Sequence, residues 1–163
     1  MSKLFRTTLW ILSGIGLISF FFQTLSTFLI SPLMGLLSLL IAAILVALVI
    51  YLLQRSPMWA RPARLWAALA FLWGGGVAVA LALISAGPVM QLAIGSGWVD
   101  SMMSWSGAYP EEISKATGVI FVLMSFRQLN RPWHGWMVGA VVGLGFEACE
   151  NILYGAMGAT MHP

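Results

Sequence analysis

Apolar residues run along this chain in five long stretches separated by short polar segments. The stretches cover residues 7–30, 33–53, 65–86, 110–126 and 135–158. Each is close to the roughly 20 residues that an α-helix needs to cross the hydrocarbon core of a bilayer. The pattern therefore predicts an all-α, polytopic helical bundle of about five transmembrane spans, forming a single integral membrane domain over residues 1–163.

The segment between the third and fourth spans is rich in aromatic residues. It reads GPVMQLAIGSGWVDSMMSWSGAYP and contains Trp98, Trp105 and Tyr109. Trp and Tyr side chains are enriched where a membrane meets water. We therefore expect an interfacial or re-entrant segment before the fourth span, and we interpret Asp100 within it as a solvated charge.

Composition supports a membrane protein and excludes several other classes. Hydrophobic residues make up 60% of the chain, charged residues make up 8%, and the mean hydropathy is +0.93. These values lie far outside the range of soluble globular domains. The single cysteine, Cys149, excludes an internal disulfide framework, and the sequence contains no zinc-type Cys/His cluster.

The basic residues give an orientation. Of the eight Lys and Arg residues, all but Lys115 fall at the same end of five alternating spans: Lys3 and Arg6, then Arg55, Arg61 and Arg64, then Arg127 and Arg131. Basic loops normally stay on the cytoplasmic side. The pattern predicts a cytoplasmic N-terminus and an outer C-terminus. It accounts for the basic isoelectric point without nucleic-acid binding.

The fourth span begins with an unusual charge cluster. Glu111, Glu112 and Lys115 stand at the head of an otherwise apolar segment, directly after Pro110. Lys115 is four residues from Glu111 and three from Glu112, so a helix lets it neutralise either carboxylate. Two carboxylates near a helix N-terminus are also favoured by the helix dipole.

The fifth span carries a second polar group. Its apolar sequence is interrupted by Glu147, Glu150 and Asn151. An ionised carboxylate near the bilayer centre costs on the order of 3 kcal/mol, so such residues normally face a partner or a water-filled cavity. Gly139 and Gly143 on the same helix form a small-xxx-small pair, which predicts close packing against another helix.

The two charged groups are predicted to lie at one level. Glu111 is sixteen residues before Arg127, and Glu150 is sixteen residues after His134. At about 1.5 Å per residue, both carboxylates are about 24 Å from the cytoplasmic ends of their helices. Antiparallel neighbouring helices would bring them together toward the outer face. From the residues alone, this site fits a structural salt bridge, a proton relay or a hydrolytic centre.

The segments PEEISK and GLGFEACENILY resemble the paired motifs of the PrsW family of intramembrane proteases, which is related to the CAAX prenyl proteases. The resemblance implies that Glu111 is a general base and that Glu112 and Lys115 set its charge state. It also implies that Glu150 orients the water or acts as a second acid/base. The catalytic residues would thus be Glu111, Glu112 and Glu150, with Lys115, Phe146, Asn151 and Tyr154 in support.

The family has a third motif, a His on a later span, for which this chain offers no matching residue. His134 lies in the cytoplasmic loop, and His162 lies just beyond the expected end of the fifth span. If a metal such as zinc is used, Glu111, Glu112 and Glu150 would be its oxygen ligands, although catalytic zinc normally takes His as well. The sequence therefore predicts no particular cofactor.

The resemblance implies an intramembrane endopeptidase in a bacterial inner membrane. It would cut a membrane-anchored protein near the outer face, and an anti-sigma factor is one substrate of this kind. Two alternatives are a non-catalytic relative that binds membrane proteins and a small ion- or proton-coupled carrier. The expected partners are the substrate and the lipid bilayer, and the sequence indicates no oligomeric state.

Overall fold

A computed structural model describes residues 3–161, and within this range the chain forms helices and no strand. The elements are α1 (Lys3–Ile30), α2 (Pro32–Arg55), α3 (Arg64–Leu72), η1 (Trp73–Ala78), α4 (Val79–Gly95), η2 (Val99–Ser101), α5 (Met102–Ser106), α6 (Ala108–Ser125) and α7 (Pro132–Met161). The predicted all-α fold of a polytopic membrane protein is confirmed.

Four stretches of the described residues are long and apolar enough to cross a membrane. They are Lys3–Ile30, Pro32–Arg55, Arg64–Gly95 and Pro132–Gly155. The predicted fourth span corresponds to α6, which does not meet this standard because three of its 18 residues are charged. The charge cluster that identifies the candidate site therefore also makes α6 the least membrane-like of the long helices.

The third apolar helix is longer than its apolar pattern predicts. The helical path from Arg64 continues past Ala86 and through Pro88 to Gly95. Much of the expected interfacial segment is therefore a continuation of α4. A turn at Gly97, whose φ is +79°, then leads back toward α6. Positive φ is readily adopted by glycine because it has no Cβ.

The aromatic residues of this segment form a stack. The ring centroids of Trp98 and Trp105 are 4.9 Å apart, and those of Trp105 and Tyr109 are 4.6 Å apart. Stacked aromatic rings stabilise each other beyond their buried area. The stack ties η2 and α5 to the start of α6.

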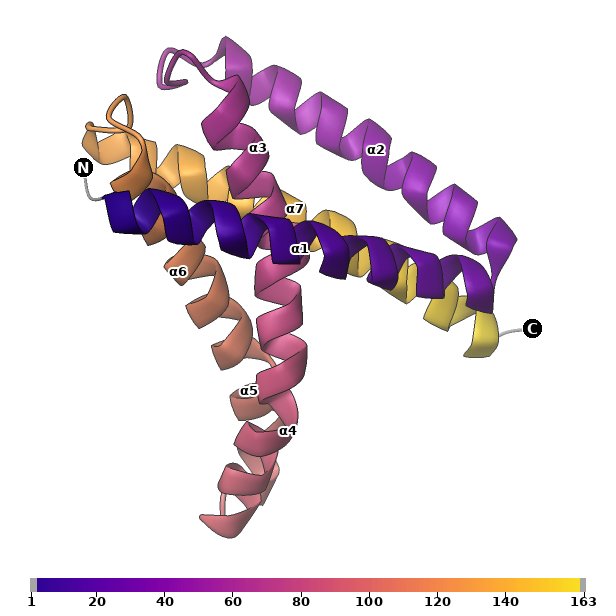
Figure 1. The fold of residues 1–163 in the computed structure, drawn as a ribbon. Helices are drawn as coiled ribbons and strands as arrows, with labels where there is room; N and C mark the ends of the chain where they lie inside the picture. The colour runs from indigo at the N-terminus through magenta and orange to yellow at the C-terminus, as the bar shows by residue number, and fades with distance from the viewer. Residues whose placement is uncertain (1–2, 162–163) are drawn as a thin grey trace.

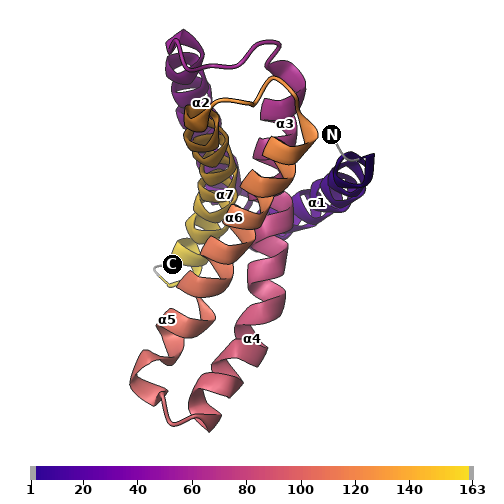
Figure 2. The same ribbon diagram turned by 90° about the vertical axis from the view of Figure 1, so that its left-hand side faces the viewer.

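The helices form two groups that cross. Figure 1 shows α1, α2 and α7 as long rods extending between the same two ends of the molecule, while α3, α4 and α6 run steeply across them. Figure 2 shows α4 and α6 side by side, joined through α5. The ends of α2 and α6 and the beginnings of α1, α3 and α7 gather on one side, so the basic loops are together.

The crossing point is η1, a π-helical turn with the sequence WGGGVA. A Cβ on Gly74 would overlap the carbonyl oxygen of Val142 in α7, and a Cβ on Gly76 would overlap the backbone of Gly16 in α1. Backbones approach this closely only where side chains are absent. The triple glycine therefore lets α1 and α7 pass on two sides of the same turn.

The predicted close packing at Gly139 and Gly143 is wrong for Gly143. A Cβ on Gly143 would meet no atom within 4 Å, and one on Gly139 would make only an ordinary contact with Val119 at 3.9 Å. The close approach on α7 is instead at Gly145, where a Cβ would overlap the carbonyl oxygen of Phe71. The small-residue spacing identified the right helix but the wrong glycines.

Candidate active site between α6 and α7

The first turn of α6 presents the first carboxylate. Gly107 precedes the helix, and the backbone N–H of Glu111 donates to the Gly107 carbonyl oxygen at 3.3 Å. Glu111 is thus held at the positive end of the helix dipole, which favours a negative charge. Its side chain is half-buried, so water can reach it.

Lys115 is held between two partners. Its Nζ lies 2.7 Å from Oε1 of Glu112, and the same atom lies 4.0 Å from the ring centroid of Phe146 on α7. The Lys115 side chain is 21% exposed while that of Glu112 is 71% exposed, so the ammonium is turned inward from its exposed partner. An ammonium over an aromatic face is attracted by the ring's negative face.

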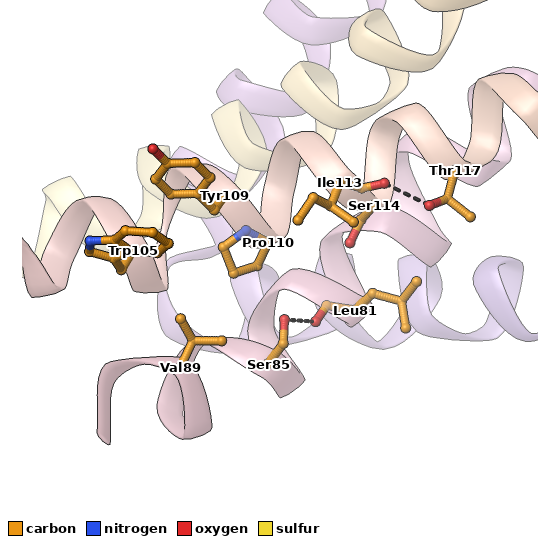
Figure 3. A pocket seen from close by; sticks show the side chains of 9 residues that line it. All are labelled: Leu81, Ser85, Val89, Trp105, Tyr109, Pro110, Ile113, Ser114 and Thr117. Atoms are coloured by element: carbon orange, nitrogen blue, oxygen red, sulfur yellow. Dashed lines mark hydrogen bonds between the residues drawn. The ribbon is translucent and has the colours of Figure 1, made fainter. Parts of the chain in front are cut away.

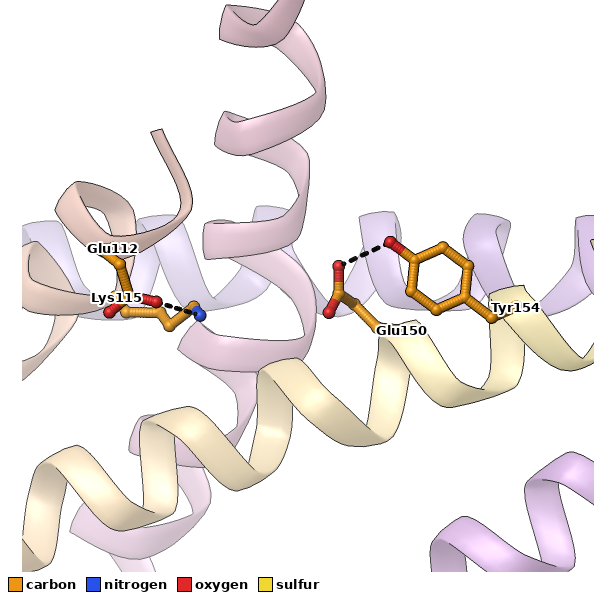
Figure 4. Close-up of polar contacts among 4 residues, drawn as sticks. All are labelled: Glu112, Lys115, Glu150 and Tyr154. Carbon is orange, nitrogen blue, oxygen red and sulfur yellow. Dashed lines mark hydrogen bonds and ion pairs between the residues drawn. The ribbon is translucent and has the colours of Figure 1, made fainter. Parts of the chain in front are cut away.

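Glu150 extends the site along α7. The hydroxyl of Tyr154 donates to its Oε1 at 3.3 Å, one helical turn away. Figure 4 shows Lys115 reaching from α6 toward α7, with Glu150 and Tyr154 further along that helix. Glu111 and Lys115 on α6, together with Glu147 on α7, are the charged groups in the neighbourhood of Glu150. Glu150 and the charged start of α6 therefore lie in the same region of the α6–α7 interface.

The remaining predicted residues lie at the edges of this site. Phe146 is buried with 2% of its surface exposed, whereas Tyr154 is 60% exposed. Asn151 and Glu147 are both exposed. The structure thus brings Glu111, Lys115, Phe146 and Glu150 together, and it leaves Glu112 and Asn151 at the surface.

Trp73 is a site-supporting residue that sequence reasoning missed. Its indole Nε1 donates to the carbonyl oxygen of Ser114 at 3.0 Å, and its ring stacks on Phe121 at 5.3 Å between centroids. A Cβ on Gly118 would overlap this indole. Trp73 therefore fixes the turn of α6 that carries the charges. The feature of the sequence that could have identified Trp73 is its position directly before the triple glycine. These residues form the π-helical turn η1, and π-helical turns are frequent at functional sites.

A second contact fixes α7 against α1. The thiol of Cys149, adjacent to Glu150, donates to Oε1 of Gln23 at 3.5 Å, and the Gln23 amide donates to Ser19 at 2.8 Å. Cys149 is 1% exposed. The thiol is therefore a packing group.

A separate cavity of about 480 Å³ lies between α4 and α6. Figure 3 shows Ser85 and Thr117 among its lining residues, with each hydroxyl turned back to its own helix. Ser85 donates to Leu81 at 2.6 Å and Thr117 to Ile113 at 2.7 Å, so these two hydroxyls have intrahelical partners. None of Glu111, Glu112 and Glu150 lines this cavity. It is distinct from the candidate active site.

The predicted oxygen ligands do not form a complete metal site by themselves. Within residues 3–161, no three His, Cys, Asp or Glu side chains are placed to hold an ion. The Glu112 carboxylate is paired with Lys115 instead. A catalytic zinc site normally has three protein ligands, and His162 lies outside the described residues.

Comparison with known proteins gives one result. A family model described as "PrsW family intramembrane metalloprotease" matches residues 61–163, which is more than half of the chain. The matched region contains both charged segments and η1, while α1 and α2 precede it. Searches of curated proteins and of solved structures found no match.

Proposed function

Because the chain belongs to the PrsW family of intramembrane metalloproteases, we propose that it hydrolyses a peptide bond of a membrane-anchored protein. The observation that carries the proposal is the contact of the charged start of α6 with α7, where the Lys115 ammonium lies over the ring of Phe146, one helical turn before Glu150. A pair of carboxylates with one fixed cation can handle a proton and a developing negative charge in the same place.

The proposed reaction uses these residues in turn. Glu111 takes a proton from a water molecule that Glu150 orients, and the water oxygen bonds to the carbonyl carbon of the substrate. The carbon–nitrogen bond then breaks, and the leaving nitrogen takes up the proton that Glu111 received. The positive charge of Lys115 offsets the negative charge of the two carboxylates, and the exposed Asn151 amide is available to donate to the oxyanion.

The family's description implies a metal ion, which would polarise the carbonyl or the water when bound. The described residues supply the carboxylates of Glu111 and Glu150 on two neighbouring helices, but not a full set of ligands. The steps proposed above therefore run through the side chains alone.

The charge distribution supports a position for the cut. Lys3, Arg6 and the basic loops lie at the end of the bundle from which α1 and α7 start, whereas Glu111 opens α6 at its other end. With the basic end cytoplasmic, the N-terminus is in the cytoplasm of a bacterial cell and the cut falls toward the outer face of its inner membrane. A single-span protein such as an anti-sigma factor is the substrate class that fits.

Reconstitution tests this proposal. The full chain in proteoliposomes is expected to cut single-span reporter proteins near the substrate's outer end, away from its positively charged flank. Mass spectrometry of the new termini identifies the bond, and the Glu111→Gln/Glu150→Gln double variant serves as the control. Cleavage by this control at the wild-type rate, or cleavage confined to the basic flank, would contradict the proposal.

Lys115→Met is expected to lower the cleavage rate by about 30-fold. The variant removes a fixed positive charge near the negative charge that develops in the transition state, and losing about 2 kcal/mol of this electrostatic stabilisation lowers the rate about 30-fold. It also removes the contact with Phe146, which affects stability. The same substitution leaves the Glu112 carboxylate without its ion-pair partner. Lys115→Arg retains the charge and should recover part of the loss. An unchanged rate and an unchanged melting temperature for Lys115→Met would show that the ammonium has no role.

A further inference from the structure

The loops at the basic end of the bundle enclose a second, larger cavity of about 1010 Å³. It lies between the segment joining α2 to α3 and the segment joining α6 to α7. Its polar and aromatic lining consists of Gln54, Trp59, Arg61, Arg64, Phe126 and Gln128. None of the residues assigned to hydrolysis contributes to it.

The positive charge at this end of the bundle is not balanced by acidic residues of the described chain. Seven of the eight Lys and Arg residues lie at this end, and none of the five Asp and Glu residues does. Arg55 lies over the ring of Tyr51 at 4.6 Å, and Arg131 lies over the ring of Trp133 at 5.2 Å. Within residues 3–161 the guanidinium groups of Arg61 and Arg64 have no ion pair and no such ring.

The walls of the cavity are held in place by contacts between elements. The Gln128 side-chain amide donates to the carbonyl oxygen of Pro62 at 3.3 Å, which joins the two loops. The indole of the fully buried Trp66 donates to the carbonyl oxygen of Ala60 at 3.1 Å. Its ring lies 4.6 Å from that of Trp59. The cavity is therefore part of the folded bundle, and its two arginines project from a fixed frame.

We propose that this cavity binds the phosphate-bearing headgroup of an anionic membrane lipid. Two guanidinium groups three residues apart present planar donors that match phosphate oxygens. Arg64 opens the apolar stretch of α3, so the cavity lies at the level where hydrocarbon gives way to headgroups. Basic pockets between membrane helices on this side attract anionic headgroups. The apolar lining residues Leu65 and Phe126 suit contact with the acyl chains of the lipid.

Thermal unfolding of the full chain in a neutral detergent tests the proposal. Phosphatidylglycerol is expected to raise the melting temperature in a saturable way, while phosphatidylcholine is not. Arg61→Gln/Arg64→Gln is expected to raise the half-saturating phosphatidylglycerol concentration at least tenfold. Arg55→Gln/Arg131→Gln makes the same change in net charge outside the cavity lining and should alter it by less than threefold.

Two further measurements distinguish a lipid headgroup site from diffuse charge attraction and from a site for free phosphate. Arg61→Lys/Arg64→Lys keeps the charge and loses the planar donors, so it should fold and bind with an intermediate affinity. Inorganic phosphate at millimolar concentration should give a smaller shift than the lipid. Equal weakening by the two glutamine double variants would overturn the proposal in favour of diffuse attraction. A full shift from inorganic phosphate with none from the lipid would overturn the lipid as the source.

Discussion

Glu111→Gln and Glu150→Gln are each expected to reduce peptide cleavage by about 1,000-fold or more, and the double variant is expected to be no worse than either single variant. Each substitution keeps the shape of the side chain and removes its ability to take a proton. General acid–base catalysis contributes about 100- to 10,000-fold. Groups that act in one step are strongly non-additive, and both residues are proposed to act in the same hydrolytic step.

Glu147→Gln is the matched control for this experiment. Glu147 is on the same helix as Glu150 and is exposed, and it has no role in the proposed hydrolysis. Its replacement should therefore leave most of the activity. The measurement is the rate of reporter cleavage in proteoliposomes, with the amount of reconstituted protein determined for each variant. An inactive Glu147→Gln beside an active Glu150→Gln would mean that the assigned face of α7 is wrong.

Gly74→Ala is expected to destabilise the fold by at least about 3 kcal/mol, or to prevent the chain from accumulating. The added Cβ would overlap the carbonyl oxygen of Val142, and both atoms belong to helix backbones that cannot move independently. Overpacking a well-packed interior shifts side chains and backbone at a cost of about 1–3 kcal/mol, and occasionally more. The measurement is thermal unfolding in detergent together with the yield of folded protein.

Gly143→Ala gives the comparison for this stability experiment. The same methyl group is added to a glycine of α7, but it meets no atom within 4 Å. Its effect should be close to zero, or slightly stabilising because alanine favours a helix more than glycine does. Equal losses from Gly74→Ala and Gly143→Ala would show that η1 is not a point of close helix contact.

Much of the fold could be predicted because its signals are local. A run of about 20 apolar residues predicts a helix without reference to any other part of the chain. The basic loops and the two charged segments can also be recognised from the types of the individual residues in the sequence. For this reason the ends of α1 and α2 agree with the predicted spans to within a few residues, and the two segments that resemble family motifs meet in the structure.

The details of packing could not be predicted because they depend on which helices touch. The pattern suggested that Gly143 would pack closely, but the approach is at Gly74, Gly76 and Gly145, where α7 and α1 cross η1. Helical periodicity shows which residues share a face, and it does not show which neighbour covers that face or at what angle. The role of Trp73 was missed for the same reason, since its partner Ser114 is 41 residues away.

The sequence by itself determined that this protein is a helical membrane protein with its basic charge at one end and two acidic segments on its last two long helices. Only the tertiary structure decided that Lys115 pairs with Glu112 and lies over Phe146, and that Arg61 and Arg64 line one cavity. Hydrophobicity and charge are properties of single residues summed over a segment. A site is instead made by distances between helices, which the crossing at the η1 glycines sets.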